Sequence, residues 1–146
     1  RNDDLMSMTF KYKRIDRPEP LPPTISPMIP VTFKGSKGII DAICLLDSGA
    51  DVSTIPRGLA EIIGLDLSGK KEEIQGIGGN IEAIVSKVLI VIQRKHERYQ
   101  ILTEVRIIPP QDDEDKFPIL IGRKDFFESF NITFKENDKK IILKKV

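Results

Sequence analysis

The sequence predicts an all-β domain, a closed barrel or folded sheet with one or two short helices. Short apolar or alternating segments recur at regular spacing and are separated by glycine-rich or polar turns, a pattern typical of such folds. Aromatic residues make up 6% of the chain and Trp is absent, so Ile, Leu and Val must build the core. The length of 146 residues suffices for one domain with a modest core, but not for two.

We divide the chain into an extended, proline-rich arm over residues 1–27 and one domain over residues 28–146. Met8–Ile15 alternates in polarity and could form an edge strand. Arg17–Pro30 has prolines at positions 18, 20, 22, 23, 27 and 30. Because proline fixes φ and lacks an N–H, this segment is expected to stay extended and outside the middle of a sheet. It is either a linker or a strap lying on the body.

A hairpin is predicted next, with Val31–Lys34 and Gly38–Leu46 flanking the turn at residues 35–37. Gly38–Leu46 is almost continuously apolar after Asp41, as a strand covered on both faces would be. Pro56–Ile63 is expected to form a short helix that ends at Gly64, with Leu59, Ile62 and Ile63 on one side.

The second half of the chain continues the strand pattern. Strands are expected over these segments: Ile81–Ile92, Arg98–Ile108, Phe117–Gly122, Ile132–Lys135 and Lys140–Leu143. Pro109–Lys116 is an acidic loop, Lys124–Phe130 a second short helix, and Asn137-Asp138 the turn of a C-terminal hairpin.

Composition argues against several classes of function. The formal net charge is +1 and the cations are scattered, which gives no reason to expect a nucleic acid or an anionic membrane as partner. No segment reaches the length of a membrane span. Arg1–Met8 is polar and does not predict a secretory signal, so a cytoplasmic location is expected.

Metal and cofactor chemistry is not indicated either. The chain has one cysteine, Cys44, and one histidine, His96, whereas metal sites usually need several such ligands. Cys44 lies in an apolar run and is expected to be a buried, inert thiol. His96 lies in a charged stretch and is expected to face solvent. We therefore predict no metal and no cofactor.

The residues that point to chemistry are Asp47-Ser48-Gly49, which follow an apolar strand directly. Gly49 allows a tight turn and leaves room beside the carboxylate for a second chain or a substrate. Taken alone, the triplet could simply be a polar turn that ends a strand.

Three segments together resemble the retropepsins, the single-domain aspartic proteases related to those of retroviruses. Leu45–Asp51 is similar to their active-site loop, whose pattern is apolar-apolar-Asp-[Thr/Ser]-Gly-Ala. Residues 74–79 (Ile-Gln-Gly-Ile-Gly-Gly) resemble their glycine-rich flap tip, and residues 119–123 (Ile-Leu-Ile-Gly-Arg) their late apolar-Gly-Arg motif. The three matches occur in the family's order and frame the chain from Met28 to its C-terminus, but not the arm.

The resemblance implies a single-domain, closed β-barrel-like acid protease fold that is homodimeric, and a role for each matched residue. Asp47 would be the catalytic carboxylate, Ser48 would hydrogen-bond across the dimer axis, and Gly49 would present its carbonyl to the substrate. Substrate contacts are implied for Ala50, Asp51, Gln75, Gly76, Ile77, Gly78 and Gly79. Structural support is implied for Ser53, Gly122 and Arg123, with a partly buried ion pair between Asp51 and Arg123. Without the resemblance, Arg123 could be a surface residue that starts a helix, and the glycines an ordinary hairpin turn.

An aspartic protease needs two carboxyl groups, because they share one proton: the ionised group activates water and the protonated group binds the scissile carbonyl. This chain contains one Asp-Ser-Gly, and it has about half the length of a two-lobed enzyme. The resemblance therefore implies an identical second subunit that supplies a second Asp47. The substrate would be a peptide or protein in extended conformation, in a site lined by apolar residues such as Ile77, Ile119 and Ile121.

Two other functions stay open. The chain could be a catalytically inactive dimeric module of the same fold that binds peptides or acts as a scaffold. It could also be a generic β-barrel binding domain, although the three ordered motifs disfavour that. The C-terminal strands are expected to take part in the dimer interface.

Overall fold

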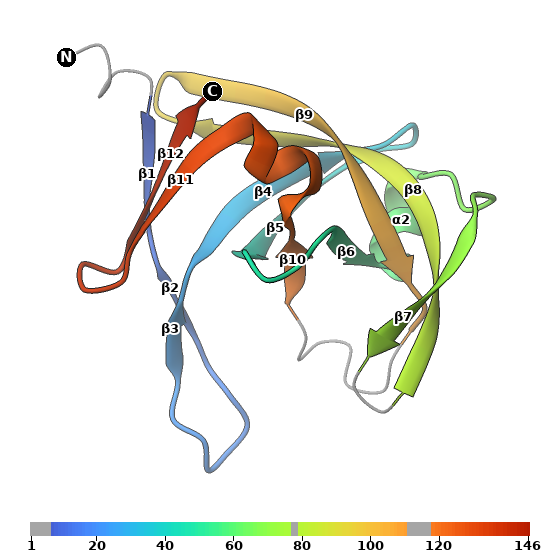
Figure 1. Cartoon of the computed structure of the whole chain (residues 1–146), viewed down its shortest axis with the longest axis horizontal. Helices are drawn as coiled ribbons and strands as arrows, with labels where there is room; N and C mark the ends of the chain where they lie inside the picture. Colours follow the sequence, from blue (N-terminus) through green and yellow to red (C-terminus); the bar gives the residue numbers. More distant parts are fainter. Residues whose placement is uncertain (1–6, 77–78, 111–117) are drawn as a thin grey trace.

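The computed structural model describes residues 7–76, 79–110 and 118–146, which form mostly β-strands (Figure 1). The strands are β1 Ser7–Lys11, β2 Lys13–Ile15, β3 Thr24–Ser26, β4 Met28–Lys34, β5 Ile39–Leu46, β6 Ser53–Pro56, β7 Lys71–Gly76, β8 Gly79–Arg94, β9 Glu97–Ile108, β10 Ile119–Ile121, β11 Phe130–Lys135 and β12 Lys140–Lys145. The helical segments are α2, Arg57–Ile63, and η2, Arg123–Phe127.

The largest sheet closes on itself. Its strands follow the order β4-β5-β10-β6-β9-β8-β7, and β4 also pairs with β8 through Thr32↔Val91 and Lys34↔Leu89. The ring is therefore complete without β7, which adds to the first part of β8 outside it. This closure confirms the predicted all-β, barrel-like architecture. It also leaves few strand edges without hydrogen-bond partners.

Strand β10 is inserted between β5 and β6, which follow one another in the sequence. It runs parallel to β5, with Leu120 beside Leu45, and antiparallel to β6, with Leu120 beside Thr54. The parallel pairing of β6 with β9 continues the ring. A late segment of the chain is thus held next to the residues that follow β5.

Side chains alternate between the inside and the outside of the ring, as the period of a strand requires. The inner face forms the hydrophobic core, where Phe33, Ile55 and Ile90 are completely buried. The expectation that β5 is covered on both faces is wrong: Ile39 is 62% and Ile43 45% exposed on its outer face. An apolar run does not by itself distinguish a strand with two buried faces from one with a single buried face.

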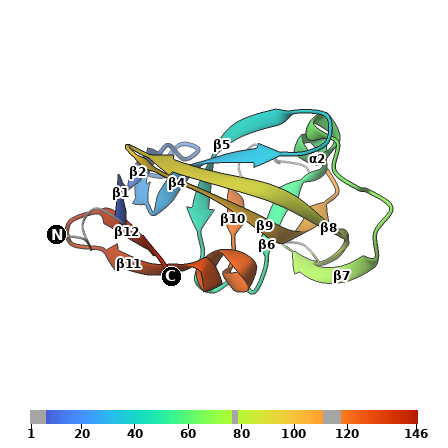
Figure 2. The same cartoon turned by 90° about the horizontal axis from the view of Figure 1, so that it is seen from above.

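A three-stranded sheet, ordered β1-β12-β11, packs at one end of the barrel, and α2 and β7 lie at the other end (Figure 2). Strand β1 is an edge strand, and its Met8 and Phe10 are buried in the common core. The single strand predicted over Met8–Ile15 is divided in two, because β1 ends at Lys11 and β2 begins at Lys13 and pairs with β3. The hairpin of β11 and β12 is confirmed as well. The proline-rich segment enters sheets more than expected, because it supplies β3 and the start of β4. Pro30 pairs only with β5, so its missing N–H costs no bond to β8.

The first predicted helix is α2, whose N-cap residue is Pro56 and whose C-cap is Gly64 in the left-handed conformation (φ +75°). A side chain at Gly64 would also meet Lys37, so glycine is required there twice over. Leu59 and Ile63 are buried as expected, but Ile62 is exposed.

The second predicted helix is shorter and less regular than Lys124–Phe130. Lys124 and Asp125 have non-helical backbone angles inside η2, and Phe130 already belongs to β11. Of the predicted strand over residues 117–122, the structure has Ile119–Ile121, while Phe117 and most of the acidic loop lie outside the described residues.

Candidate active site

Strand β5 delivers Asp47 to a tight turn beside β10. The amide N–H of Asp47 donates to the carbonyl of Ile121, 3.0 Å away, so the ladder between β5 and β10 extends to the aspartate itself. The amide of Ala50 then donates to the carbonyl of Asp47 at 3.1 Å, and the amide of Gly49 donates to the Asp47 carboxylate Oδ1 at 2.9 Å. The first two bonds hold the backbone of Asp47, and the third orients its carboxylate. Asp47 is half-buried, and Ser48 and Gly49 are exposed in the single chain.

Residues 122–124, which follow β10, hydrogen-bond to this loop and support it. The amide of Arg123 donates to the carbonyl of Ala50, and the amide of Lys124 to that of Asp51, both at 2.9 Å. The amide of Gly122 donates to the hydroxyl of Ser53, a completely buried residue, at 3.0 Å. The structure thus brings the three expected support residues, Ser53, Gly122 and Arg123, together against the loop.

The ion pair between Arg123 and Asp51 is present, as expected. The expectation that it is partly buried is wrong for the single chain, because the side chains of Arg123 and Asp51 are 55% and 86% exposed. An ion pair of this exposure contributes little to stability, since water screens both charges.

The hairpin formed by β7 and the start of β8 carries the glycine-rich motif. Gln75 lies opposite Asn80 and Gly76 opposite Gly79, while Ile77 and Gly78 lie outside the described residues. By strand alternation, Gln75 and Asn80 share one face of the hairpin, and Ile74 and Ile81 share the other.

One row of side chains joins the outer faces of five strands. The cross-strand partners run from β5 to β8 as Leu45, Leu120, Thr54, Arg106 and Val85. All are half-buried, and we call them the outer row. Asp47 follows Leu45 by two positions, so it continues on the side of the outer row. The hairpin face with Ile74 and Ile81 belongs to the same side, because Ile81 and Val85 are four positions apart in β8 and side chains alternate along a strand.

Solved structures that resemble this fold include two aspartic proteases. A retropepsin-like aspartic protease from Rickettsia conorii matches with a TM-score of 0.54 and 15% identity, over 94% of this chain and 91% of that chain. The EIAV protease, solved with the inhibitor HBY-793, matches with a TM-score of 0.42 and 21% identity, over 75% of this chain and 88% of that chain. This chain has the retropepsin-like fold. No family model matches the chain, and no curated protein sequence matches it.

Within the retropepsin-like fold, the apolar residues expected to line the substrate site need a correction. Ile121 is completely buried and Ile119 is the register partner of the buried Cys44, so both belong to the core side of β10. Leu120, between them, is the residue of β10 on the side of Asp47. The apolar run Ile119–Ile121 gave no sign of which residue faces which way, because all three are aliphatic. Ile77 lies outside the described residues.

The sequence reasoning also missed Thr54, Arg106 and Ile81, which lie on the Asp47 side. The alternation of side chains along a strand could have shown which residues of one strand share a face of the sheet. The grouping across strands depends on register, which the sequence pattern does not specify.

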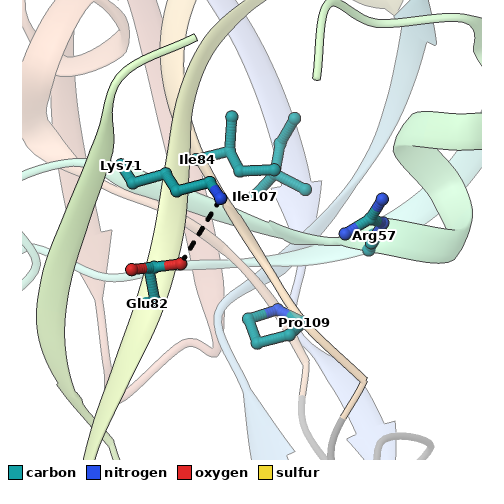
Figure 3. A pocket seen from close by; sticks show the side chains of 6 residues that line it. All are labelled: Arg57, Lys71, Glu82, Ile84, Ile107 and Pro109. Atoms are coloured by element: carbon teal, nitrogen blue, oxygen red, sulfur yellow. Dashed lines mark ion pairs between the residues drawn. The ribbon is translucent and has the colours of Figure 1, made fainter. Parts of the chain in front are cut away.

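A pocket of about 210 Å³ lies on the other face of the β7–β8 hairpin, at its base. Lys71 Nζ and Glu82 Oε1 form an ion pair at 3.8 Å. Figure 3 shows this pair on one side of the pocket and Arg57, from the start of α2, on the other. Ile84, Ile107 and Pro109 complete the lining. No residue of the Asp47 loop lines this pocket, so it does not belong to the candidate active site.

Residues 7–76, 79–110 and 118–146 contain no group of three His, Cys, Asp or Glu side chains that could hold a metal ion. Cys44 is buried as expected, and its burial raises the pKa of the thiol. His96 is exposed in the turn between β8 and β9, also as expected. Among the described helices, none combines the length and the apolarity that crossing a bilayer requires.

Proposed function

We propose that this chain is an aspartic endopeptidase, active as a homodimer, which hydrolyses extended peptides with water activated between the Asp47 residues of its two subunits. The observation that carries the proposal is the position of Asp47, at the end of β5 and bonded to β10, in a chain with the retropepsin-like fold. An aspartate held by backbone bonds on both sides keeps its orientation, which a shared-proton pair of carboxyl groups requires.

The second carboxylate would come from an identical subunit. The sequence has one Asp-Ser-Gly, and a single carboxyl group cannot be general base and general acid at once. The exposure of Ser48 and Gly49 in the single chain is consistent with a second subunit or a substrate meeting them there. In this arrangement Ser48 bonds across the two-fold axis and Gly49 presents its carbonyl to the substrate backbone.

The substrate would lie between the outer row and the β7–β8 hairpin, which we propose as the flap. A peptide in extended conformation can add main-chain hydrogen bonds to such a hairpin, while its side chains alternate between pockets. Leu45, Leu120, Ile74 and Ile81 supply apolar surface there, which favours hydrophobic residues next to the cut. We assign substrate contacts to Ala50, Asp51 and the flap residues 75–79, and the catalytic domain to residues 28–146. Residues 1–27 would act as a strap through β1.

The test is cleavage of an unstructured protein at acidic to neutral pH by the full chain. We expect cleavage that pepstatin-like inhibitors block and that Asp47→Asn abolishes, with the circular dichroism spectrum and the dimer unchanged. Asp41→Asn is the matched control, because it makes the same change on the exposed face of the same strand, and it should leave cleavage intact.

An Asp47→Asn variant that still cleaves would contradict the proposal. A wild-type chain that forms a folded dimer and binds peptides without cleaving them would instead identify the inactive binding module of the same fold.

A further inference from the structure

Arg106 places a guanidinium group in the outer row, between Thr54 and Val85. Its side chain is only 12% exposed and contacts two carboxylates: Nη2 lies 3.3 Å from Oε2 of Glu72, and Nη1 donates to Oε2 of Glu104 at 2.8 Å. Its Nε atom is buried and has no hydrogen-bond partner among the described residues. Burying a cation this far is costly, and partners on two sides offset much of the cost.

The contact with Glu72 crosses a strand. Arg106 belongs to β9 and Glu72 to β7, and β8 lies between them in the sheet. Two inter-strand spacings amount to about 10 Å, so only a long side chain can span the gap. Glu72 lies opposite Ala83 and therefore shares the face of Val85 and Arg106. The pair consequently ties the base of the β7–β8 hairpin to the body of the barrel.

The contact with Glu104 continues toward the Asp47 loop. Lys124 Nζ lies 3.1 Å from Oε2 of Glu104, and the amide of Glu104 donates to Oδ2 of Asp125 at 2.8 Å. Lys124 and Asp125 belong to η2 and directly follow Arg123, which supports the loop. Contacts between charged side chains thus connect the hairpin, through Arg106 and Glu104, to η2, which follows β10.

We propose that Arg106 is a positioning residue that holds the hairpin, through Glu72, in place over the outer row and so lowers the cost of closing it on a substrate. We call the ion pair of Arg106 and Glu72 the tether. The tether itself is a property of the fold, whereas its effect on substrate binding rests on the proposed endopeptidase function. The ion pair of Lys71 and Glu82 cannot serve this purpose, because both residues belong to the hairpin and both side chains are more than half exposed.

Hydrogen–deuterium exchange on the full-length chain tests the tether without any need for activity. In Glu72→Gln we expect the amides of β7 and of the start of β8 to exchange about three- to tenfold faster than in the wild type. Glu73→Gln is the matched control, because it is the next residue and faces the other way, and its exchange should stay within about twofold of the wild type.

Arg106→Met should show the same acceleration, since Met keeps the aliphatic packing but not the charge. The double variant should exchange no faster than Arg106→Met alone, as expected for two residues of one interaction. Unchanged exchange in Glu72→Gln would overturn the tether, as would equal acceleration by Glu73→Gln. If Arg106→Met does not fold, the exchange of Glu72→Gln alone still decides whether the contact between Arg106 and Glu72 holds the hairpin.

Peptide kinetics test the effect on substrate. In Glu72→Gln the KM should rise about threefold or more with kcat within about twofold, because a looser hairpin must be ordered on binding. Faster exchange with unchanged KM would refute the role toward substrate and keep the tether. A wild-type chain that cleaves no peptide would refute the proposed function, while the exchange data would still decide the tether.

Discussion

Gly122 occupies a position where the segment after β10 passes against the backbone of the Asp47 loop. A Cβ atom built on Gly122 would lie 2.5 Å from the carbonyl carbon of Val52 and 2.9 Å from the carbonyl oxygen of Ala50. Real Cβ atoms do not approach backbone this closely, so any side chain would push the loop away from its support. At the scale of single residues, the support of the Asp47 loop by the segment after β10 therefore requires glycine at position 122.

We predict that Gly122→Ala lowers the free energy of unfolding by about 1–3 kcal/mol, because backbone on both sides must shift to make room. Urea denaturation followed by circular dichroism measures the change. Gly58→Ala is the control, because Gly58 lies within α2 and its added methyl group would meet no atom within 4 Å beyond its chain neighbours and the backbone of the helix itself. This second change should stabilise the chain by about 0.5–1 kcal/mol. Equal effects of the two substitutions would contradict the close approach described for Gly122.

At the scale of elements, β9 carries the charges that connect the hairpin to η2. Hydrogen bonds from Arg106 and Lys124, in that order of size, hold the pKa of Glu104 below its ordinary value of 4.5. A carboxyl group whose pKa is lowered by folding stabilises the folded state above its unfolded pKa. That contribution disappears as the pH falls through the lower, folded pKa.

Glu104→Gln should therefore flatten the acid side of the stability profile. We expect the wild type to be more stable than Glu104→Gln at pH 7, and the difference to shrink as the pH falls below 4.5. Urea denaturation of both proteins across this pH range gives the comparison. A difference that grows toward acid pH would contradict the assigned direction of the pKa shift.

At the scale of the whole molecule, the proposed function needs two chains for one active site. Its loop leaves Ser48 exposed, and the ion pair behind it is exposed as well. A second subunit covering this region would shield the ion pair from water, which strengthens the attraction between the two charges at a cost in desolvation. The proposed homodimer accounts for these exposed groups through one interface.

We predict that Ser48→Ala weakens dimerisation, because it removes one hydrogen bond from each of two symmetry-related loops. Such a bond contributes about 1 kcal/mol, so the dissociation constant should rise by about tenfold or more across both copies. Sedimentation over a range of concentrations measures this constant. A dissociation constant equal to that of the wild type would remove the role across the axis, and a monomeric wild type would remove the dimer itself.

The amino-acid sequence by itself determined most of the strands, the first helix, and the position of the candidate catalytic residue Asp47 at the end of a strand. Alternating and apolar runs predicted most of the strands, and Gly64 predicted the end of α2, because these signals act between near neighbours in the chain. The same local signals put Asp47 at the end of a strand and Gly76 and Gly79 in a hairpin.

The tertiary structure alone decided which residues share a surface. The insertion of β10 between β5 and β6 put the side chain of Leu120, rather than that of Ile121, on the face of the sheet to which Asp47 belongs, and the register of β9 put Arg106 within reach of Glu72. Strand order and register are set by hydrogen bonds and packing between segments far apart in the chain. The pattern within one strand is the same whichever partner it takes, and a shift of one residue exchanges its two faces.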